Sequence, residues 1–247
     1  MTPLLRWIAL VLGALLALQL FFVARIALMV VVDPQSTAFQ RSEAWRIWNE
    51  KDSLRWRQQW VPYDQISEHL KRAVVASEDD GYRSHGGVDW EALEKAWQKN
   101  SRAGEQAAKR VAAPTKATNQ GSKPPKVVGG STITQQLAKN LLLSGERTLL
   151  RKGQEMLLTL VLETLLDKRR ILEIYLNSVE WGEGVFGAQA AAEHYYRKPA
   201  SKLTAYEAAR LAVMLPRPKY FEKLPNSGYL SSRASTIIAR MADAQLP

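Results

Sequence analysis

The sequence predicts a mainly α-helical protein with one N-terminal membrane-spanning helix. An almost unbroken apolar stretch lies near the N-terminus, Leu- and Ala-rich helical periodicity runs from about Leu137 to Leu215, and strand-like alternation is weak throughout. The chain has 247 residues, of which 46% are hydrophobic, and this is enough for one sizeable domain and an additional segment.

The apolar stretch predicts a membrane anchor over residues 1–33. Trp7 to Ala24 is interrupted only by Gln19, and as a helix it spans about 27 Å. A cleavable signal peptide is the competing interpretation, but no Ala-x-Ala cleavage site occurs. Arg6 in the short N-terminal tail favours a cytoplasmic N-terminus and an exported domain.

Residues 34–63 are predicted to be a juxtamembrane segment. They carry four tryptophans at near-helical spacing, among several arginines: Trp45, Trp48, Trp56 and Trp60. This pattern is typical of an amphipathic segment beside a membrane, where indole rings are favoured. Packing of the same rings on the domain explains the pattern equally well. The remaining chain, 64–247, is assigned to a single domain.

The charge balance indicates an anionic partner. The chain has 34 Lys and Arg against 24 Asp and Glu, a net charge of +10, and no cysteine, which excludes disulfides and cysteine-ligated zinc. Residues 100–128 lack large apolar side chains and are interpreted as a mobile basic loop. No aromatic residues interleave with those cations, so lipid headgroups are favoured and nucleic acid is not predicted.

No organic cofactor is predicted. Gly182 to Gly187 matches G-x-G-x-x-G, but the match follows a helical pattern rather than a strand, and Glu183 would repel a pyrophosphate. We therefore expect no dinucleotide site.

The densest group of polar side chains lies between Gly129 and Asn140. It combines a glycine pair with hydroxyls, carboxamides and Lys139. This composition suits a glycine entry into a helix that presents donors and a cation to an anionic, oxygen-rich ligand. A glycine turn followed by an ordinary Ser/Thr N-cap is the alternative.

A first carboxylate candidate is Glu78. A helical stripe from Ile66 to Ser77 ends in Glu78-Asp79-Asp80, which places acids at the negative end of the helix dipole. Such a position raises the pKa of at least one carboxyl group, as a general base or acid requires. A solvated acidic turn is the alternative. His85 and Asp89 follow in a compact turn, where they could orient neighbouring groups.

A second carboxylate candidate is Glu155. It precedes an apolar run at 156–162 that is predicted to be buried, so Glu155 needs a cation or a metal as partner. Arg151 lies one turn earlier, and an ordinary ion pair is the alternative. Two carboxylates near several cations suit chemistry on a sugar joined to a phosphate; these cations are Lys139, Arg147, Arg151 and Lys152.

Five motifs in this order resemble those of a known family. They are Glu78-Asp79-x-x-Tyr82-x-x-His85-x-Gly87-x-Asp89, Gly130-Ser131-Thr132-Ile133-Thr134-Gln135-Gln136-x-x-Lys139-Asn140, Arg151-Lys152-x-x-Glu155, Ile171-Leu172-Glu173-x-Tyr175-Leu176-Asn177 and Arg210 to Pro218. Over roughly residues 60–220 the chain resembles the peptidoglycan glycosyltransferases of family 51. It resembles their monofunctional form, since the Ser-x-x-Lys, Ser-Asp-Asn and Lys-Thr-Gly motifs of a transpeptidase are absent.

The resemblance implies a lysozyme-like fold and an enzyme that polymerises lipid II with inversion. It implies that Glu78 is the general base and that Glu155 assists departure of the lipid diphosphate, directly or through a divalent metal such as Mg or Mn. The implied substrate-binding residues are Ser131, Thr132, Gln135, Gln136, Lys139, Asn140, Arg147, Arg151 and Lys152. Asp79, His85 and Asp89 are expected to orient the site.

The resemblance also implies a location and partners. The expected location is the cytoplasmic (inner) membrane, with a single span and the catalytic domain on the extracytoplasmic side. The expected partners are lipid II, the growing glycan strand, the membrane and other cell-wall synthesis proteins. Two alternatives remain: a glycan-cleaving hydrolase that also uses a carboxylate pair, and a non-catalytic anchored scaffold that binds anionic lipid or cell-wall partners.

Overall fold

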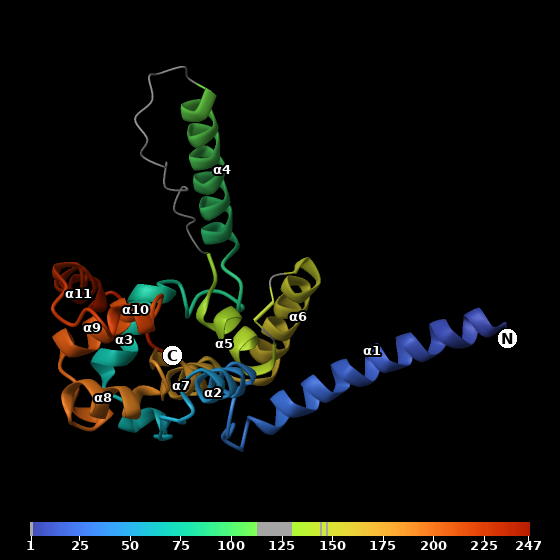
Figure 1. Ribbon diagram of the computed structural model, residues 1–247, viewed down its shortest axis with the longest axis horizontal. Helices are drawn as coiled ribbons and strands as arrows, with labels where there is room; N and C mark the ends of the chain where they lie inside the picture. The colour runs from blue at the N-terminus through green and yellow to red at the C-terminus, as the bar shows by residue number, and fades with distance from the viewer. Residues whose placement is uncertain (1, 113–129, 144, 147) are drawn as a thin grey trace.

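The computed structural model describes residues 2–112, 130–143, 145–146 and 148–247 and is mainly helical, as the sequence predicts (Figure 1). In chain order its elements are α1 (Pro3–Leu28), α2 (Ala38–Lys51), β1 (Arg57–Gln58), the 3-10 helix η1 (Tyr63–Gln65), α3 (Glu68–Glu78), α4 (Trp90–Ala112), α5 (Ile133–Leu142), α6 (Leu149–Leu165), α7 (Lys168–Ser178), β2 (Glu180–Gly182), β3 (Val185–Phe186), α8 (Ala188–Tyr196), the 3-10 helix η2 (Ala200–Lys202), α9 (Ala205–Met214), α10 (Pro218–Phe221) and α11 (Gly228–Met241).

Helix α1 extends away from the rest of the molecule (Figure 1). Its most apolar 18-residue window has a mean hydropathy of 2.4, and none of that window is buried. Its C-terminal part contacts the body, where Ile26 is fully buried. By length and composition α1 could therefore cross a membrane.

The body consists of two groups of packed helices. In one group α3, α9 and α11 pack against one another, and in the other α5 packs against α2, α6 and α7. The helical stripe predicted before Glu78 forms α3, which buries Leu70 and Val74 completely. The hydrophobic core continues from this stripe into both groups, so the end of α3 is held between them.

A small sheet joins the segment after α2 to the chain after α7. Its strand order is β1-β3-β2, with β1 parallel and β2 antiparallel to β3. Gly184 turns between β2 and β3 at a φ of +71°, and a Cβ there would lie 2.0 Å from the Arg55 carbonyl oxygen. Gly184 of the G-x-G-x-x-G match thus serves a tight turn between strands.

The predicted juxtamembrane segment is structurally part of the body. Helix α2 begins with a capping box between Thr37 and Gln40, and the Gln40 amide donates to the Ser178 carbonyl at 3.3 Å. The four tryptophans divide between the two interpretations. Trp45 and Trp48 are exposed, whereas the other two pack on the domain: Trp56 stacks on Phe186, and Trp60 lies beneath Arg170.

The interpretation of residues 100–128 as a loop is wrong for its first part. Residues 100–112 continue α4, which stands away from the body (Figure 1). Ala, Gln, Glu, Lys and Arg dominate this stretch and are strong helix formers, so the helix needs no large apolar side chains. The rest of the predicted loop, 113–128, lies outside the described residues.

Helix α6 buries only one face, so the prediction that its apolar run at 156–162 is buried is wrong for part of that run. Leu158 and Leu162 are in the core, but Leu157 and Leu160 are 45% and 49% exposed. Leu149 and Leu150, at the beginning of the helix, are also exposed. An apolar run alone does not distinguish burial in a protein core from exposure toward lipid.

Candidate active site

Glu78 is the last residue of α3, and Asp79 leaves the helical conformation directly after it. The Glu78 side chain is partly buried, and its Oε2 accepts a hydrogen bond of 3.0 Å from the Gln136 amide. Burial raises the pKa of the Glu78 carboxyl, the Gln136 hydrogen bond opposes this, and the neighbouring Asp79 charge adds to it. Glu78 is therefore a more basic carboxylate than an exposed glutamate.

Gln136 is held in place by Tyr175, a residue to which the sequence assigned no role. The buried Tyr175 hydroxyl donates to Gln136 Oε1 at 3.0 Å, which directs the amide NH₂ toward Glu78. Burial raises the pKa of Tyr175 well above its ordinary value, so the hydroxyl remains a donor at neutral pH. Tyr175 lies in one of the motifs shared with the family, and nothing else in the sequence indicated a role for it.

Asp79 and His85 connect the end of α3 to the beginning of α5. One Asp79 oxygen lies 2.8 Å from His85 Nε2, and the other accepts the Ile133 backbone N–H at 2.9 Å. Gly87 N–H in turn donates to His85 Nδ1 at 3.2 Å. Both residues thus fix backbone around Glu78, whereas Asp89 accepts the Ala92 N–H at 2.8 Å and caps α4.

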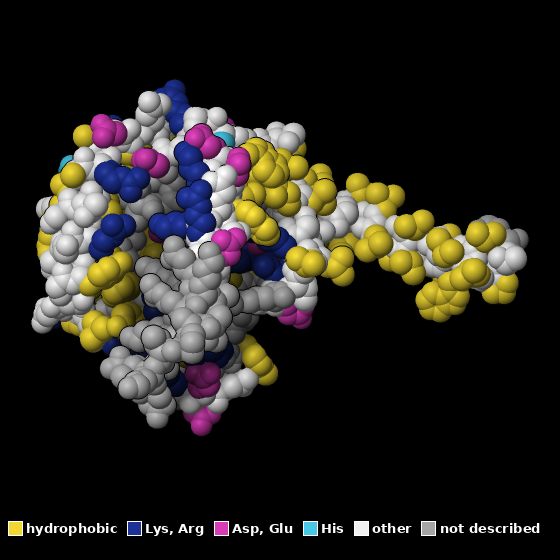
Figure 2. Space-filling model, turned by 90° about the horizontal axis from the view of Figure 1, so that it is seen from above, with side chains coloured by type: hydrophobic (Ala, Val, Ile, Leu, Met, Phe, Trp, Pro, Cys, Tyr) yellow, Lys and Arg dark blue, Asp and Glu magenta, His cyan; other side chains and the backbone are white. Residues whose placement is uncertain are grey.

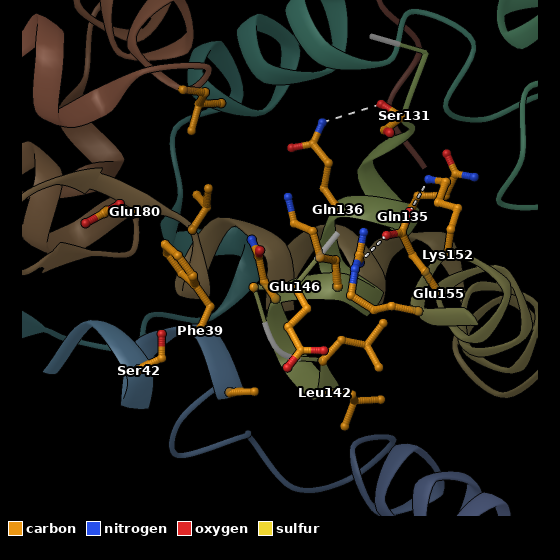
Figure 3. Close-up of a pocket in the computed structure, with 18 of the residues that line it drawn as sticks. Phe39, Ser42, Ser131, Gln135, Gln136, Leu142, Glu146, Lys152, Glu155 and Glu180 are labelled. Atoms are coloured by element: carbon orange, nitrogen blue, oxygen red, sulfur yellow. Dashed lines mark hydrogen bonds and ion pairs between the residues drawn. The ribbon is translucent and has the colours of Figure 1, made fainter. Parts of the chain in front are cut away.

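Glu155 is buried between two cations on α6. Arg151 Nη1 lies 2.8 Å from Glu155 Oε2, and Lys152 contacts the other oxygen (Figure 3). The prediction that Arg151 pairs with Glu155 is confirmed. The same geometry also fits the alternative, an ordinary ion pair within one helix. Burial of the carboxylate at 3% exposure distinguishes it from a surface pair.

Gln136, Glu155 and the two cations beside Glu155 line one pocket of about 760 Å³. On one side are Glu155, Lys152 and Ser131, and on the other are Glu180 with Phe39 and Ser42 of α2 (Figure 3). Eight of the predicted site residues line it: Ser131, Gln135, Gln136, Lys139, Asn140, Arg151, Lys152 and Glu155. Glu78 adjoins the pocket through Gln136. Figure 2 shows Lys and Arg side chains gathered at the centre of one face, with hydrophobic side chains between them and α1.

Thr132 forms the N-cap that the alternative interpretation describes. Its side chain accepts the Gln135 N–H, and Gln135 Oε1 accepts the Thr132 N–H in return. The Thr132 hydroxyl donates to the Gly87 carbonyl at 2.6 Å. Thr132 is therefore buried beside the pocket, whereas Gln135 serves the cap and also lines the pocket. Arg147 lies outside the described residues.

The donor set does not fit a resident metal. Among the residues that the structure describes, no three His, Cys, Asp or Glu side chains form a group that could hold one. Both Glu155 oxygens are already engaged by Arg151 and Lys152. Mg²⁺ commonly binds through one or two carboxylates together with substrate phosphates, so Glu155 alone offers at most one protein ligand.

Glu180 lines the pocket together with Glu155 and Glu146, and no motif identified it. It is 7% exposed at the beginning of β2, with Lys219 Nζ 3.4 Å from its Oε1. Burial raises the pKa of Glu180 to about 7, Lys219 opposes the rise, and the nearby Glu43 adds to it. Its side chain thus titrates in the neutral range.

Replacing Glu180 by glutamine is expected to stabilise the protein at high pH. A raised pKa means that the folded state holds the proton more tightly, so the stability that Glu180 contributes falls as pH rises from about 4.5 through about 7. We expect Glu180→Gln to gain about 1–3 kcal/mol at pH 8 and to lose that advantage near pH 4.5. Thermal unfolding of the solubilised protein against pH measures this.

Glu207 offers a matched control of opposite sign. Burial opposes the shift, but hydrogen bonds from Lys198 and Thr204 lower the pKa of Glu207. Glu207→Gln should therefore lose stability at pH 8 and approach the wild type in acid. Equal pH dependence of stability in Glu180→Gln and the wild type would contradict the assignment.

Comparisons with known proteins cover most of the chain. Residues 48–242 match the family model described as Transglycosylase. The chain is 53% identical to a biosynthetic peptidoglycan transglycosylase of Burkholderia thailandensis, covering 98% of this chain and 88% of that protein. It is 52% identical to the protein of the same description from Burkholderia pseudomallei, with the same coverage of both chains.

Proposed function

Because the chain belongs to the transglycosylase family and is a peptidoglycan glycosyltransferase of cell-wall synthesis, we propose that it polymerises lipid II into β1,4-linked glycan. The acceptor 4-hydroxyl oxygen forms a bond to the donor's anomeric carbon as the bond from that carbon to the diphosphate oxygen breaks. Glu78 takes the hydroxyl proton, and undecaprenyl diphosphate leaves with the bonding electrons. Direct displacement of an α-linked donor inverts the anomeric centre and needs no covalent intermediate.

One observation carries this proposal: the cation cluster lines a pocket, and Gln136 of the same pocket donates a hydrogen bond to the carboxylate of Glu78. Burial raises the pKa of Glu78, which suits proton abstraction. Arg151 and Lys152 can stabilise the charge that develops on a departing diphosphate. We assign Ser131, Gln135, Lys139 and Asn140 to the same ligand, because they line the same pocket as Arg151 and Lys152.

We also propose that α1 anchors the enzyme in the cytoplasmic membrane with the body on the extracytoplasmic side. Most of its apolar side chains are exposed, and Arg6 lies close to its N-terminus. A substrate with a lipid tail would then meet the pocket from the membrane surface. The exposed Trp45 and Trp48 of α2 suit the interface beside this anchor.

Incubation of the full-length protein in detergent with labelled lipid II tests the proposed function. We expect a ladder of glycan chains on a gel that lysozyme digests. Cleavage of preformed glycan without polymerisation would instead identify a hydrolase. Unchanged lipid II, beside folded protein and an active control enzyme, would favour the non-catalytic scaffold.

Removal of divalent metal is expected to slow polymerisation without abolishing it. Glu155 is already paired with Arg151 and Lys152, and the described residues contain no group of three His, Cys, Asp or Glu side chains that could hold a metal, so a metal would have to be held mainly by the substrate diphosphate. We expect a loss of about tenfold or less with EDTA, restored by Mg²⁺ or Mn²⁺, because the cations continue to neutralise the diphosphate. Complete loss in EDTA would show that the metal is essential.

A further inference from the structure

The single polar interruption in the apolar run of α1 has a specific partner. Gln19 Nε2 donates to Gln154 Oε1 at 3.0 Å, and Gln154 Nε2 donates to Gln19 Oε1 at 2.9 Å. The two amides thus form a reciprocal pair between α1 and α6, which pack against each other. Both side chains are partly buried by this contact.

A second contact between α1 and the body lies at the end of the same helix face. Gln19, Phe22, Ile26 and Met29 recur every three to four residues and face the body, where Ile26 and Met29 are buried. Arg170 of α7 donates to the Met29 carbonyl at 2.8 Å and pairs with Asp33 at 2.7 Å. The contacts at Gln19 and at Met29 are about 15 Å apart along the helix. Together they fix the tilt and rotation of α1 relative to the body.

The pair lies next to the cation cluster. Gln154 precedes Glu155 directly in α6 and follows Arg151 and Lys152 within one turn. An amide inside hydrocarbon needs a partner, because no water replaces a missing hydrogen bond there. Gln19 supplies that partner from the apolar segment of α1, and its position therefore defines how deep this end of α6 lies.

We propose that the Gln19–Gln154 pair is a positioning contact that docks the membrane helix on α6 and sets the depth of the Arg151–Glu155–Lys152 cluster at the membrane surface. This inference rests on the proposed function, since the cluster is assigned to the diphosphate of a membrane-bound substrate. The pair makes α1 part of substrate capture as well as an anchor.

Cross-linking tests the contact independently of activity. The chain has no cysteine, so Gln19→Cys with Gln154→Cys introduces the only two thiols. In proteoliposomes a short thiol-specific bifunctional reagent should join them efficiently. Ala17 lies about 200° around the helix from Gln19, so Ala17→Cys with Gln154→Cys is the matched control and should not cross-link. Equal yields from both pairs would overturn the proposal.

Kinetics in lipid II-containing proteoliposomes test the function of the contact. We expect Gln19→Leu and Gln154→Leu each to raise KM about three- to tenfold, with kcat changed by less than about twofold. The double variant should show the same increase as either single variant, because each residue acts through the other. Ala17→Leu should leave both constants unchanged. Additive effects, or an unchanged KM, would refute the positioning role.

The two experiments separate the possible failures. If the wild type makes no glycan, the proposed function fails, and the cross-linking yields still decide whether the docked arrangement exists in a bilayer. If the wild type polymerises lipid II but the two cysteine pairs react alike, the enzyme assignment stands and the positioning contact is wrong.

Discussion

Glu78→Gln is expected to abolish polymerisation of lipid II while leaving the fold intact. Glutamine keeps the shape of the side chain but cannot take the proton of the attacking hydroxyl, and loss of a general base costs about 10²- to 10⁴-fold in rate. Burial raises the pKa of Glu78, so the wild-type rate should increase with pH as this carboxyl ionises. The rate of glycan formation against pH, measured for both proteins, checks this.

Stability distinguishes a catalytic defect from a folding defect. The raised pKa of Glu78 means that ionising this carboxyl costs more in the folded state than in the unfolded state. The stability of the wild type therefore falls as the pH increases above the ordinary pKa of a glutamate. Glu78→Gln should therefore unfold at the same temperature as the wild type at pH 8, or at a higher one. Asp80→Asn is the matched control, since this exposed carboxylate lies two residues away and pairs with Arg240. Normal activity in Glu78→Gln would show that the base is another group.

Glu155→Gln is expected to lower kcat by about 10²- to 10³-fold without raising KM. The substitution leaves Arg151 and Lys152 without their acid, so these cations should bind the ground-state diphosphate at least as tightly. The same change removes the carboxylate that we expect to assist departure of the leaving group. Steady-state kinetics with lipid II separate kcat from KM, and Glu155→Asp, which keeps the charge on a shorter side chain, should lose less.

Glu68→Gln provides the control for loss of an acid that pairs with arginine on the same helix. Glu68 forms an i,i+4 pair with Arg72, but its side chain is exposed and lies outside the pocket. Its activity should match the wild type. An increased KM with unchanged kcat in Glu155→Gln would mean that Glu155 only arranges the cations for binding.

The sequence predicted the helical class and most of the pocket because the signals are local. The stripe that ends at Glu78, the spacing of Arg151 and Glu155, and the Thr132 cap each depend on neighbours within a few residues. That these segments come together around one pocket depends on the tertiary structure, which local patterns do not predict. The order of the motifs indicated it only through resemblance to a family.

The residues that sequence reasoning missed are those contributed by distant segments. Tyr175 acts on Gln136 from α7, and Phe39 and Ser42 reach the pocket from α2, which was assigned to the membrane boundary. No sequence pattern marked Glu180, because burial and the neighbouring Glu43, which raise its pKa, come from the tertiary structure. Residues 100–112 were misassigned because an absence of apolar side chains was taken to exclude a helix.

The capping box at Thr37 has a practical consequence for any soluble form of the enzyme. A fragment beginning at residue 48, where the family match starts, would discard most of α2 and with it Phe39, Ser42 and the Gln40 contact to α7. One wall of the pocket would be missing, although all five motifs would be present. We therefore expect the minimal catalytic unit to begin at or before Thr37, at the start of a helix rather than at the limit of sequence similarity.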